Sequence, residues 1–343
     1  MDYAQLAIQL GSACGPSGSE DAARELASEY LRPYVDEIET DVMGNIIALR
    51  RCEREGARRL LLCAHMDEIG FAVTGHEKGF LRFAAVGGVD ARMLPAAEVR
   101  VLAPEGPFYG VVGVMPVHAM TKEEQDKPVP GDKLFIDVGL SQEQAVGRVP
   151  LGTPAVYGGG VQRLGAEMLC GKSMDDRSCV AIIVRLMEAL QGAELDVDIC
   201  CLISTQEEVG VRGAITGGYS THPDYAIVLD VTHGETPDAP RHKTFKLGGG
   251  AAIGVGPNFN RRLTDAIIGT AKDAGLDYQI EVIAGESGTD AWPIQVSREG
   301  VATALVSLPL KYMHSPVETL KISDAENIIE LLTNFIKRAG EVL

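Results

Sequence analysis

Two separate parts of this chain show apolar, strand-like runs that alternate with helix-like runs. In the N-terminal part, a helical pattern ends near Tyr30, and strand-like runs follow at residues 45–49 and 59–64. In the C-terminal part, strands are expected at residues 197–205, 225–230 and 301–307, and helices at residues 178–190, 261–274 and 324–338. This alternation predicts an α/β fold with an open mixed sheet and helices on both faces.

The stretch between these two parts has a different character. From about Gly70 to Tyr157, glycine, proline and valine are frequent, and helical periodicity is scarce. Short strands are expected at residues 99–102, 111–114 and 133–138, and a mobile loop at residues 118–131. We therefore expect a small β domain of residues 71–162, inserted into a main domain of residues 1–70 plus 163–343.

Charge and composition narrow the function classes. The formal net charge of −17 disfavours a nucleic-acid partner, and it suits metal cations or cationic amines as well as plain solubility. No apolar run approaches the ~20 residues of a membrane span, and the first residues lack the basic segment of a signal peptide. The seven cysteines include no CxxC pair, which is typical of a reducing compartment. We expect a soluble, cytoplasmic protein without a membrane partner.

Four apolar strands of the predicted sheet stop at residues that can bind metals. The first is followed by His65, the second by Glu207 and Glu208, the third ends in Asp230, and the fourth is followed by His314. In open α/β sheets, ligands bind outside the carboxyl ends of the strands. These side chains are therefore expected to converge on one crevice.

A further pair of acids, Asp175 and Asp176, lies where a loop enters a predicted helix. Taken alone, this pair could simply cap the helix, and a lone histidine is usually an ordinary polar residue. The joint pattern is harder to explain in that way. Carboxylates at the ends of buried strands cost several kcal/mol unless a cation compensates them.

The ligand types indicate which cations fit. Imidazoles and carboxylates without thiolates suit zinc, cobalt or manganese, and two such ions about 3.5–4 Å apart need one carboxylate to bridge them. Asp67, two residues past His65, can accept the second N–H of that imidazole. Glu207 and Glu208 are adjacent and point in different directions, so one can bind metal while the other takes a proton from water.

Taken in order, short motifs along essentially the whole chain resemble one family, the dinuclear metallo-aminopeptidases of the TET type, also known as glutamyl aminopeptidases or cellulase M homologues. The motifs are PSGSE at residues 16–20, DVMGN at 41–45, HMDEIG at 65–70, DDR at 175–177, QEEVG at 206–210, DVTH at 230–233, GTDA at 288–291 and YMHSP at 312–316.

The resemblance implies an activity and a role for each residue. The protein would release N-terminal residues from peptides with two divalent ions, zinc or cobalt first and manganese as a possibility. The metal ligands would be His65, Asp175, Glu208, Asp230 and His314, with Asp175 as the bridge and a cis bond to Asp176. Glu207 would be the general base and Asp67 its orienting partner. The inserted β domain would be the dimerisation domain, and dimers would assemble into a tetrahedral dodecamer.

Three other functions fit these residues less well. The segment 166–173, AEMLCGKS, fits a relaxed phosphate-loop pattern, but its bulky and anionic residues would keep phosphate from the backbone N–H groups. A non-catalytic metal-binding scaffold does not need an intact Glu207. A glycosidase needs two carboxylates ~5–9.5 Å apart that flank a bond, whereas adjacent residues diverge.

Overall fold

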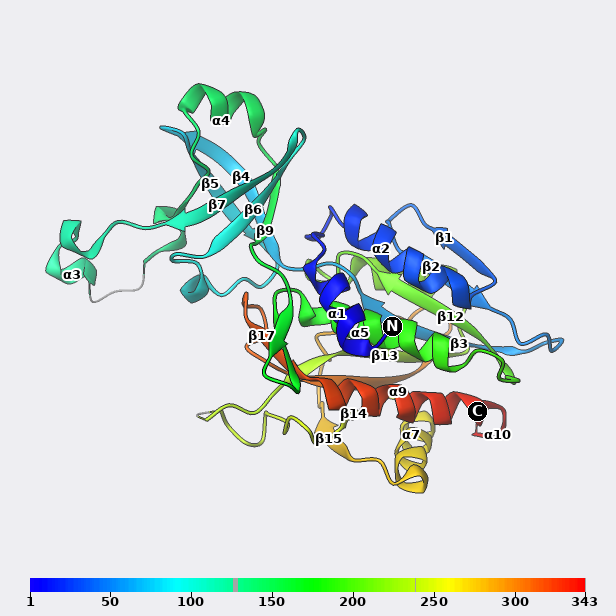
Figure 1. The fold of residues 1–343 in the computed structure, drawn as a ribbon. Coiled ribbons are helices and arrows are strands. Elements are labelled where there is room, and N and C mark those ends of the chain that lie inside the picture. The colour runs from blue at the N-terminus through cyan, green and yellow to red at the C-terminus, as the bar shows by residue number, and fades with distance from the viewer. Residues whose placement is uncertain (126–128, 238, 343) are drawn as a thin grey trace.

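Eleven strands form one mixed sheet at the centre of the larger region in Figure 1. In order across the sheet they are β1 (Glu37–Thr40), β2 (Ile46–Arg50), β12 (Val197–Ser204), β3 (Arg58–His65), β13 (Tyr225–His233), β16 (Ala302–Lys311), β17 (Glu318–Lys321), β11 (Met168–Gly171) and β10 (Gln162–Leu164), with β14 (Ala251–Val255) pairing β16 and β15 (Tyr278–Val282). Strands β12, β3, β13 and β16 are mutually parallel. Their carboxyl ends therefore meet at one edge of the sheet.

Alternate residues of the central strands pack into two apolar cores, one on each face of the sheet. On β3, Leu60 and Leu62 belong to one core, and Leu61 and Cys63 belong to the other. The face with Leu60 is covered by α1 (Tyr3–Ser12), α2 (Asp21–Leu31), α5 (Met174–Ala189), α7 (Arg261–Ala274) and α9 (Ile322–Lys337). The short helix α10 (Ala339–Val342) follows α9 in the chain. The opposite face is covered by α6 (Arg212–Ser220) and α8 (Ala291–Gln295). The predicted mixed sheet with helices on both faces is confirmed.

A closed six-stranded barrel forms the smaller region, at the upper left of Figure 1. Around the barrel the strands are β4 (Gly70–Glu77), β5 (Phe80–Val86), β8 (Phe135–Asp137), β7 (Gly106–Gly113), β6 (Glu98–Ala103) and β9 (Pro154–Tyr157). Along the chain, helix α3 (Lys122–Gln125) connects β7 to β8, and helix α4 (Gln142–Arg148) connects β8 to β9. The barrel has its own apolar core, which includes Phe71, Val101 and Ile136. The predicted small barrel-like β unit is therefore confirmed.

The structure is a computed structural model that describes residues 1–343 except 126–128, 238 and 343. Part of the loop that was expected to be mobile, residues 126–128, thus lies outside the described residues. Among the helices that are described, none has the length and apolar character needed to cross a membrane.

Several element ends differ from the sequence-based expectation. Strand β13 does not stop at Asp230, because it pairs with β16 as far as His233 opposite Leu310. Asp230 therefore lies within the strand. Helix α5 starts at Met174 instead of residue 178, but Asp175 and the next residue have non-helical backbone angles.

Candidate metal centre

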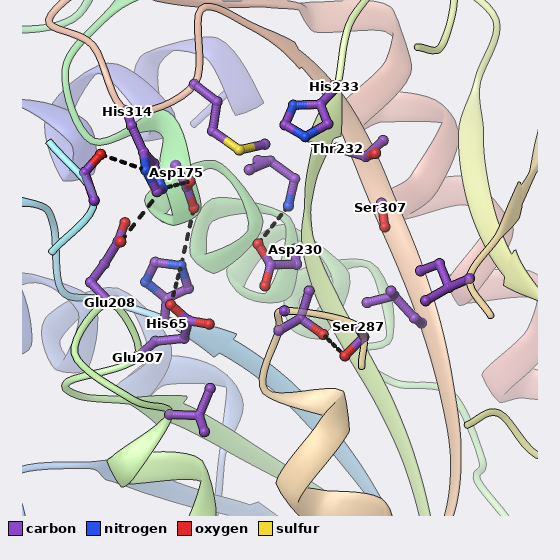
Figure 2. Close-up of a pocket in the computed structure, with 18 of the residues that line it drawn as sticks. His65, Asp175, Glu207, Glu208, Asp230, Thr232, His233, Ser287, Ser307 and His314 are labelled. Carbon is purple, nitrogen blue, oxygen red and sulfur yellow. Dashed lines mark hydrogen bonds and ion pairs between the residues drawn. The ribbon is translucent and has the colours of Figure 1, made fainter. Parts of the chain in front are cut away.

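The carboxyl ends of four neighbouring parallel strands, together with the start of α5, surround one cavity. His65 is the last residue of β3, the Glu207–Glu208 pair follows β12, and His314 follows β16. All five predicted ligands and Glu207 line this cavity, which has a volume of about 540 Å³. Figure 2 shows these side chains pointing toward one another. The structure thus brings together every residue that was predicted to bind metal.

Asp175 connects two groups of potential ligands. Its Oδ1 lies 3.1 Å from Nε2 of His65, and its Oδ2 lies 3.5 Å from Nε2 of His314. One group consists of His65, Asp175 and Asp230, the other of Asp175, Glu208 and His314, and within each the ligand atoms lie within 4.8 Å of one another. A carboxylate with one oxygen in each of two adjacent groups has the geometry needed to bridge two cations.

Negative charge accumulates in this cavity. Burial, together with Asp230, Asp290 and Asp175, raises the pKa of Glu207 to about 10. Burial and Asp175 also raise the pKa of Glu208 to about 7. Carboxylates that are buried close together favour protonation unless a cation compensates them, so the donor set fits divalent cations.

The two histidines respond to the same charges. Although burial opposes it, hydrogen bonds with Asp175 and Asp67 raise the pKa of His65 well above its usual value. For His314, the hydrogen bond with Asp175 raises the pKa to about 9 despite partial burial. Both imidazoles thus stand where a positive charge is strongly favoured.

Asp67 fixes the loop that carries both glutamates. Its Oδ1 accepts a hydrogen bond from the backbone N–H of Glu207 at 2.9 Å, and its Oδ2 accepts one from Glu208 at 3.2 Å and one from the hydroxyl of Ser17 at 2.6 Å. The predicted contact with His65 takes a different form. Nδ1 of His65 lies 3.1 Å from the backbone oxygen of Asp67 and 3.5 Å from its carboxylate. The alternation of side chains along a strand does not determine where Asp67 points, because β3 ends at His65.

A second buried carboxylate, which sequence reasoning missed, plays the same part on the other side of the cavity. Oε2 of Glu318 accepts the backbone N–H of Asp175 at 3.1 Å, and its Oε1 accepts that of His314 at 2.9 Å. Burial and the charge of Asp175 raise its pKa well above the usual value. The one available signal was its position four residues after His314, at the start of β17.

A buried cluster of charges joins the end of β3 to the start of α5. Nζ of Lys172 lies 2.8 Å from the carboxylate of Glu68, and Nη2 of Arg177 lies 3.2 Å from it. Despite burial, these two cations hold the pKa of Glu68 below its usual value. For Lys172, burial and the charge of Arg177 outweigh the attraction of Glu68 and lower its pKa. Glu68 is thus committed to an ion cluster and does not face the cavity.

The loop before α8 and the end of β13 complete the lining of the cavity. Ser287, Gly288 and Thr289 line it, as does the exposed His233. The peptide bond between Asp175 and Asp176 is cis, as the resemblance implied. The phosphate-loop interpretation is wrong, because β11 in that segment is a strand paired with β10 and β17.

Comparison with solved structures identifies the class of fold. An aminopeptidase of the archaeon Desulfurococcus kamchatkensis superposes with a TM-score of 0.90 at 34% identity, over 98% of this chain and 94% of that chain. The TET1 peptidase of Pyrococcus horikoshii, which can assemble into a tetrahedron or a large octahedral shell, superposes with a TM-score of 0.86 at 31% identity, over 98% and 99%. The mixed sheet with its barrel is thus the fold of the TET peptidases.

Sequence comparison then gives the family. The lysyl aminopeptidase of Pyrococcus furiosus is 34% identical over 322 residues, which cover 92% of each chain. The model of the M42 glutamyl aminopeptidase family matches residues 44–331, so this chain belongs to that family. The protein is therefore a peptidase of the aminopeptidase type.

Proposed function

We propose that this aminopeptidase removes N-terminal residues from peptides by means of two divalent cations and a general base. The cations would be held by His65, Asp175, Glu208, Asp230 and His314. The observation that carries the proposal is the position of Asp175, whose two carboxylate oxygens face two separate imidazoles.

The donor set restricts the choice of metal. Two imidazoles and three carboxylates, with no thiolate in either group, suit zinc or cobalt and permit manganese. When bound, such a pair of ions acidifies a water molecule and polarises a peptide carbonyl.

Glu207 is the proposed general base. Its carboxylate lies 4.0 Å from Nε2 of His65 and lines the cavity. There it would accept a proton from the attacking water and pass it to the leaving amine. Asp67 would hold this residue in place through the backbone N–H that it accepts. The acidic cavity would also attract the free α-ammonium group of the substrate, which explains action at the N-terminus.

The replacement Glu207→Gln tests this role. It keeps the shape of the side chain but removes its basicity, so turnover of an aminoacyl-p-nitroanilide should fall by roughly 10²–10⁴. Metal content, measured by mass spectrometry, should stay that of the unaltered protein. Near-normal turnover would refute the assignment.

Two alternative functions are tested in the same series. If the metal-loaded protein hydrolysed no aminoacyl substrate, the scaffold interpretation would gain support. If the protein cleaved a cellulose oligomer, and a chelator did not stop that cleavage, the glycosidase interpretation would gain support.

We further propose that residues 71–162 form an inserted domain through which the chain associates with itself, ultimately as a tetrahedral dodecamer. The barrel has its own core, and its surface exposes large apolar side chains that a partner subunit could cover. They include Tyr109 on β7, 65% exposed, and Leu151 before β9, 64% exposed. Assembly of the related TET1 peptidase into closed shells supports the same idea.

Replacing residues 71–162 with a short Gly/Ser linker tests this second proposal. Both flanks that carry the candidate ligands remain, so we expect a smaller oligomer that still binds metal. Sedimentation velocity gives the subunit count. An unchanged count would show that the barrel does not build the assembly.

The proposed compartment is the cytoplasm. All seven cysteines are free, and four of them are buried. This use of cysteine is typical of a reducing environment.

A further inference from the structure

The cavity extends well beyond the candidate metal ligands. Past Asp230 it continues over β13, β16 and β15, where Thr232, Ser307 and Glu281 line it. Figure 2 shows Thr232 and Ser307 on this side, away from the paired imidazoles. No role in the proposed hydrolysis involves these three residues.

The carboxylate of Glu281 lies at this end of the cavity and can accept further hydrogen bonds. The hydroxyl of Thr232 donates to its Oε1 at 2.5 Å, and the hydroxyl of Ser307 donates to its Oε2 at 2.8 Å. Each carboxylate oxygen can accept a second hydrogen bond. Within the described part of the chain, Glu281 forms no ion pair with a lysine or arginine. Burial raises its pKa, although the hydrogen bonds from Thr232 and Ser307 oppose that shift.

The register of the sheet sets the distance from the metal ligands to this carboxylate. Asp230 on β13 lies directly opposite Ser307 on β16. Adjacent strands are about 4.8 Å apart, so a carboxylate held by Ser307 lies roughly one to two strand spacings from Asp230. A side chain that starts beside the candidate metal ligands would have to span this distance, which suits the extended four-carbon stem of lysine.

Apolar side chains also line this cavity. They include Ile283, Leu305 and Met313. Lysine and arginine bury their methylene stems against apolar surface while their charged heads seek an acceptor. A cavity lined both by apolar side chains and by the carboxylate of Glu281 therefore offers a surface for the stem and an acceptor for the head of a basic side chain.

We propose that this end of the cavity receives the side chain of the N-terminal substrate residue, and that Glu281 selects basic residues, lysine or arginine. The inference rests on the proposed aminopeptidase reaction and adds its substrate class. A glutamate side chain at this position would meet a like charge, so acidic N-terminal residues are poor substrates.

A panel of aminoacyl-p-nitroanilides tests the proposal on the zinc- or cobalt-loaded protein. The lysyl and norleucyl substrates differ mainly in the terminal ammonium group. We expect kcat/KM for lysyl to exceed that for norleucyl on the order of 10- to 100-fold, the usual value of a hydrogen bond to a charged group. Glu281→Gln keeps acceptors and donors for Thr232 and Ser307, so it should remove this preference while norleucyl turnover stays within about 3-fold.

Glu286→Gln is the matched control. Glu286 lies five residues further on, is exposed, and is not among the described residues that line the cavity. This variant should retain the lysyl preference. A uniform loss on all substrates in Glu281→Gln would indicate a purely structural carboxylate and overturn the proposal, as would a preference of the unaltered protein for norleucyl or glutamyl substrates.

Calorimetric titration with L-lysine and L-norleucine separates this inference from the proposed reaction. If the metal-loaded protein hydrolysed no substrate, the reaction would be refuted. Tighter binding of L-lysine than of L-norleucine, lost in Glu281→Gln and kept in Glu286→Gln, would still support the selective role of Glu281. Equal binding of the two amino acids would overturn it.

Discussion

The barrel and the sheet region differ in what they bury. The described buried side chains of the barrel are apolar apart from Thr153 and the hydroxyl of Tyr157. The sheet region buries many charged residues, among them the candidate ligands and the cluster around Glu68. Buried charges cost free energy unless each has a partner, whereas apolar side chains need only to fit. The sheet region, which holds the candidate ligands, should therefore tolerate fewer substitutions at its buried positions than the barrel does.

The largest expected effect concerns Asp175, the proposed bridging carboxylate. Asp175→Ala should lower the metal content at both positions, because one side chain serves both groups of ligands. Activity should fall with the metal. Elemental analysis after gel filtration gives the stoichiometry.

Asp176→Ala is the comparison for this prediction. Asp176 is fully buried and belongs to neither group of candidate ligands found among the described residues. It should alter the geometry of the site more than its metal content. Loss of both ions in this variant, with retention in Asp175→Ala, would mean that the roles of the two aspartates are reversed.

The next largest effect concerns the stability of the sheet region. Glu68→Gln leaves Lys172 and Arg177 buried without their common carboxylate. Removing one partner from a buried ion cluster costs about 3–5 kcal/mol in the free energy of unfolding. Urea unfolding at pH 7, monitored by circular dichroism, measures the loss. A change below ~1 kcal/mol would show that water or rearrangement compensates the cations.

Acid should reduce the difference in unfolding free energy between the unaltered protein and Glu68→Gln. The pKa of Glu68 is lower in the folded protein than its ordinary value of 4.5, so its contribution is complete above that pH and is lost as the pH falls further. The gap between the unaltered protein and Glu68→Gln should therefore narrow below about pH 4.5, which a constant gap would contradict.

The smallest effect is expected in the barrel. Ile136→Val removes one methyl group from an apolar core and should cost about 0.5–1.5 kcal/mol. Metal content and turnover should not change, because no candidate ligand lies on β8. Thermal unfolding and the chromogenic assay check both points. A loss of turnover would show that the barrel supports the site more directly than its core suggests.

Sequence patterns predicted the elements that are strongly periodic and the residues that are locally distinctive. The helix expected at residues 261–274 matches α7, and the candidate ligands were located because acids and histidines interrupt apolar runs. Glu318 and Glu281 were missed because their importance comes from partners far away in the chain. Glu318 accepts a hydrogen bond from the backbone N–H of Asp175, and Glu281 accepts hydrogen bonds from hydroxyl groups on two other strands. Only the register of the sheet brings such pairs together.

The insertion of the barrel has a consequence for the order in which the protein is made. The barrel strands are continuous in the chain, from Gly70 to Tyr157, whereas the candidate site requires both His65 and His314. About 250 residues separate these two histidines, which at about 5–20 residues per second corresponds to roughly 12–50 s of synthesis. During that time the barrel can already be folded on the ribosome, but the set of candidate ligands is incomplete. We expect the nascent chain to be inactive toward the N-termini of neighbouring nascent chains until His314 has left the ribosome.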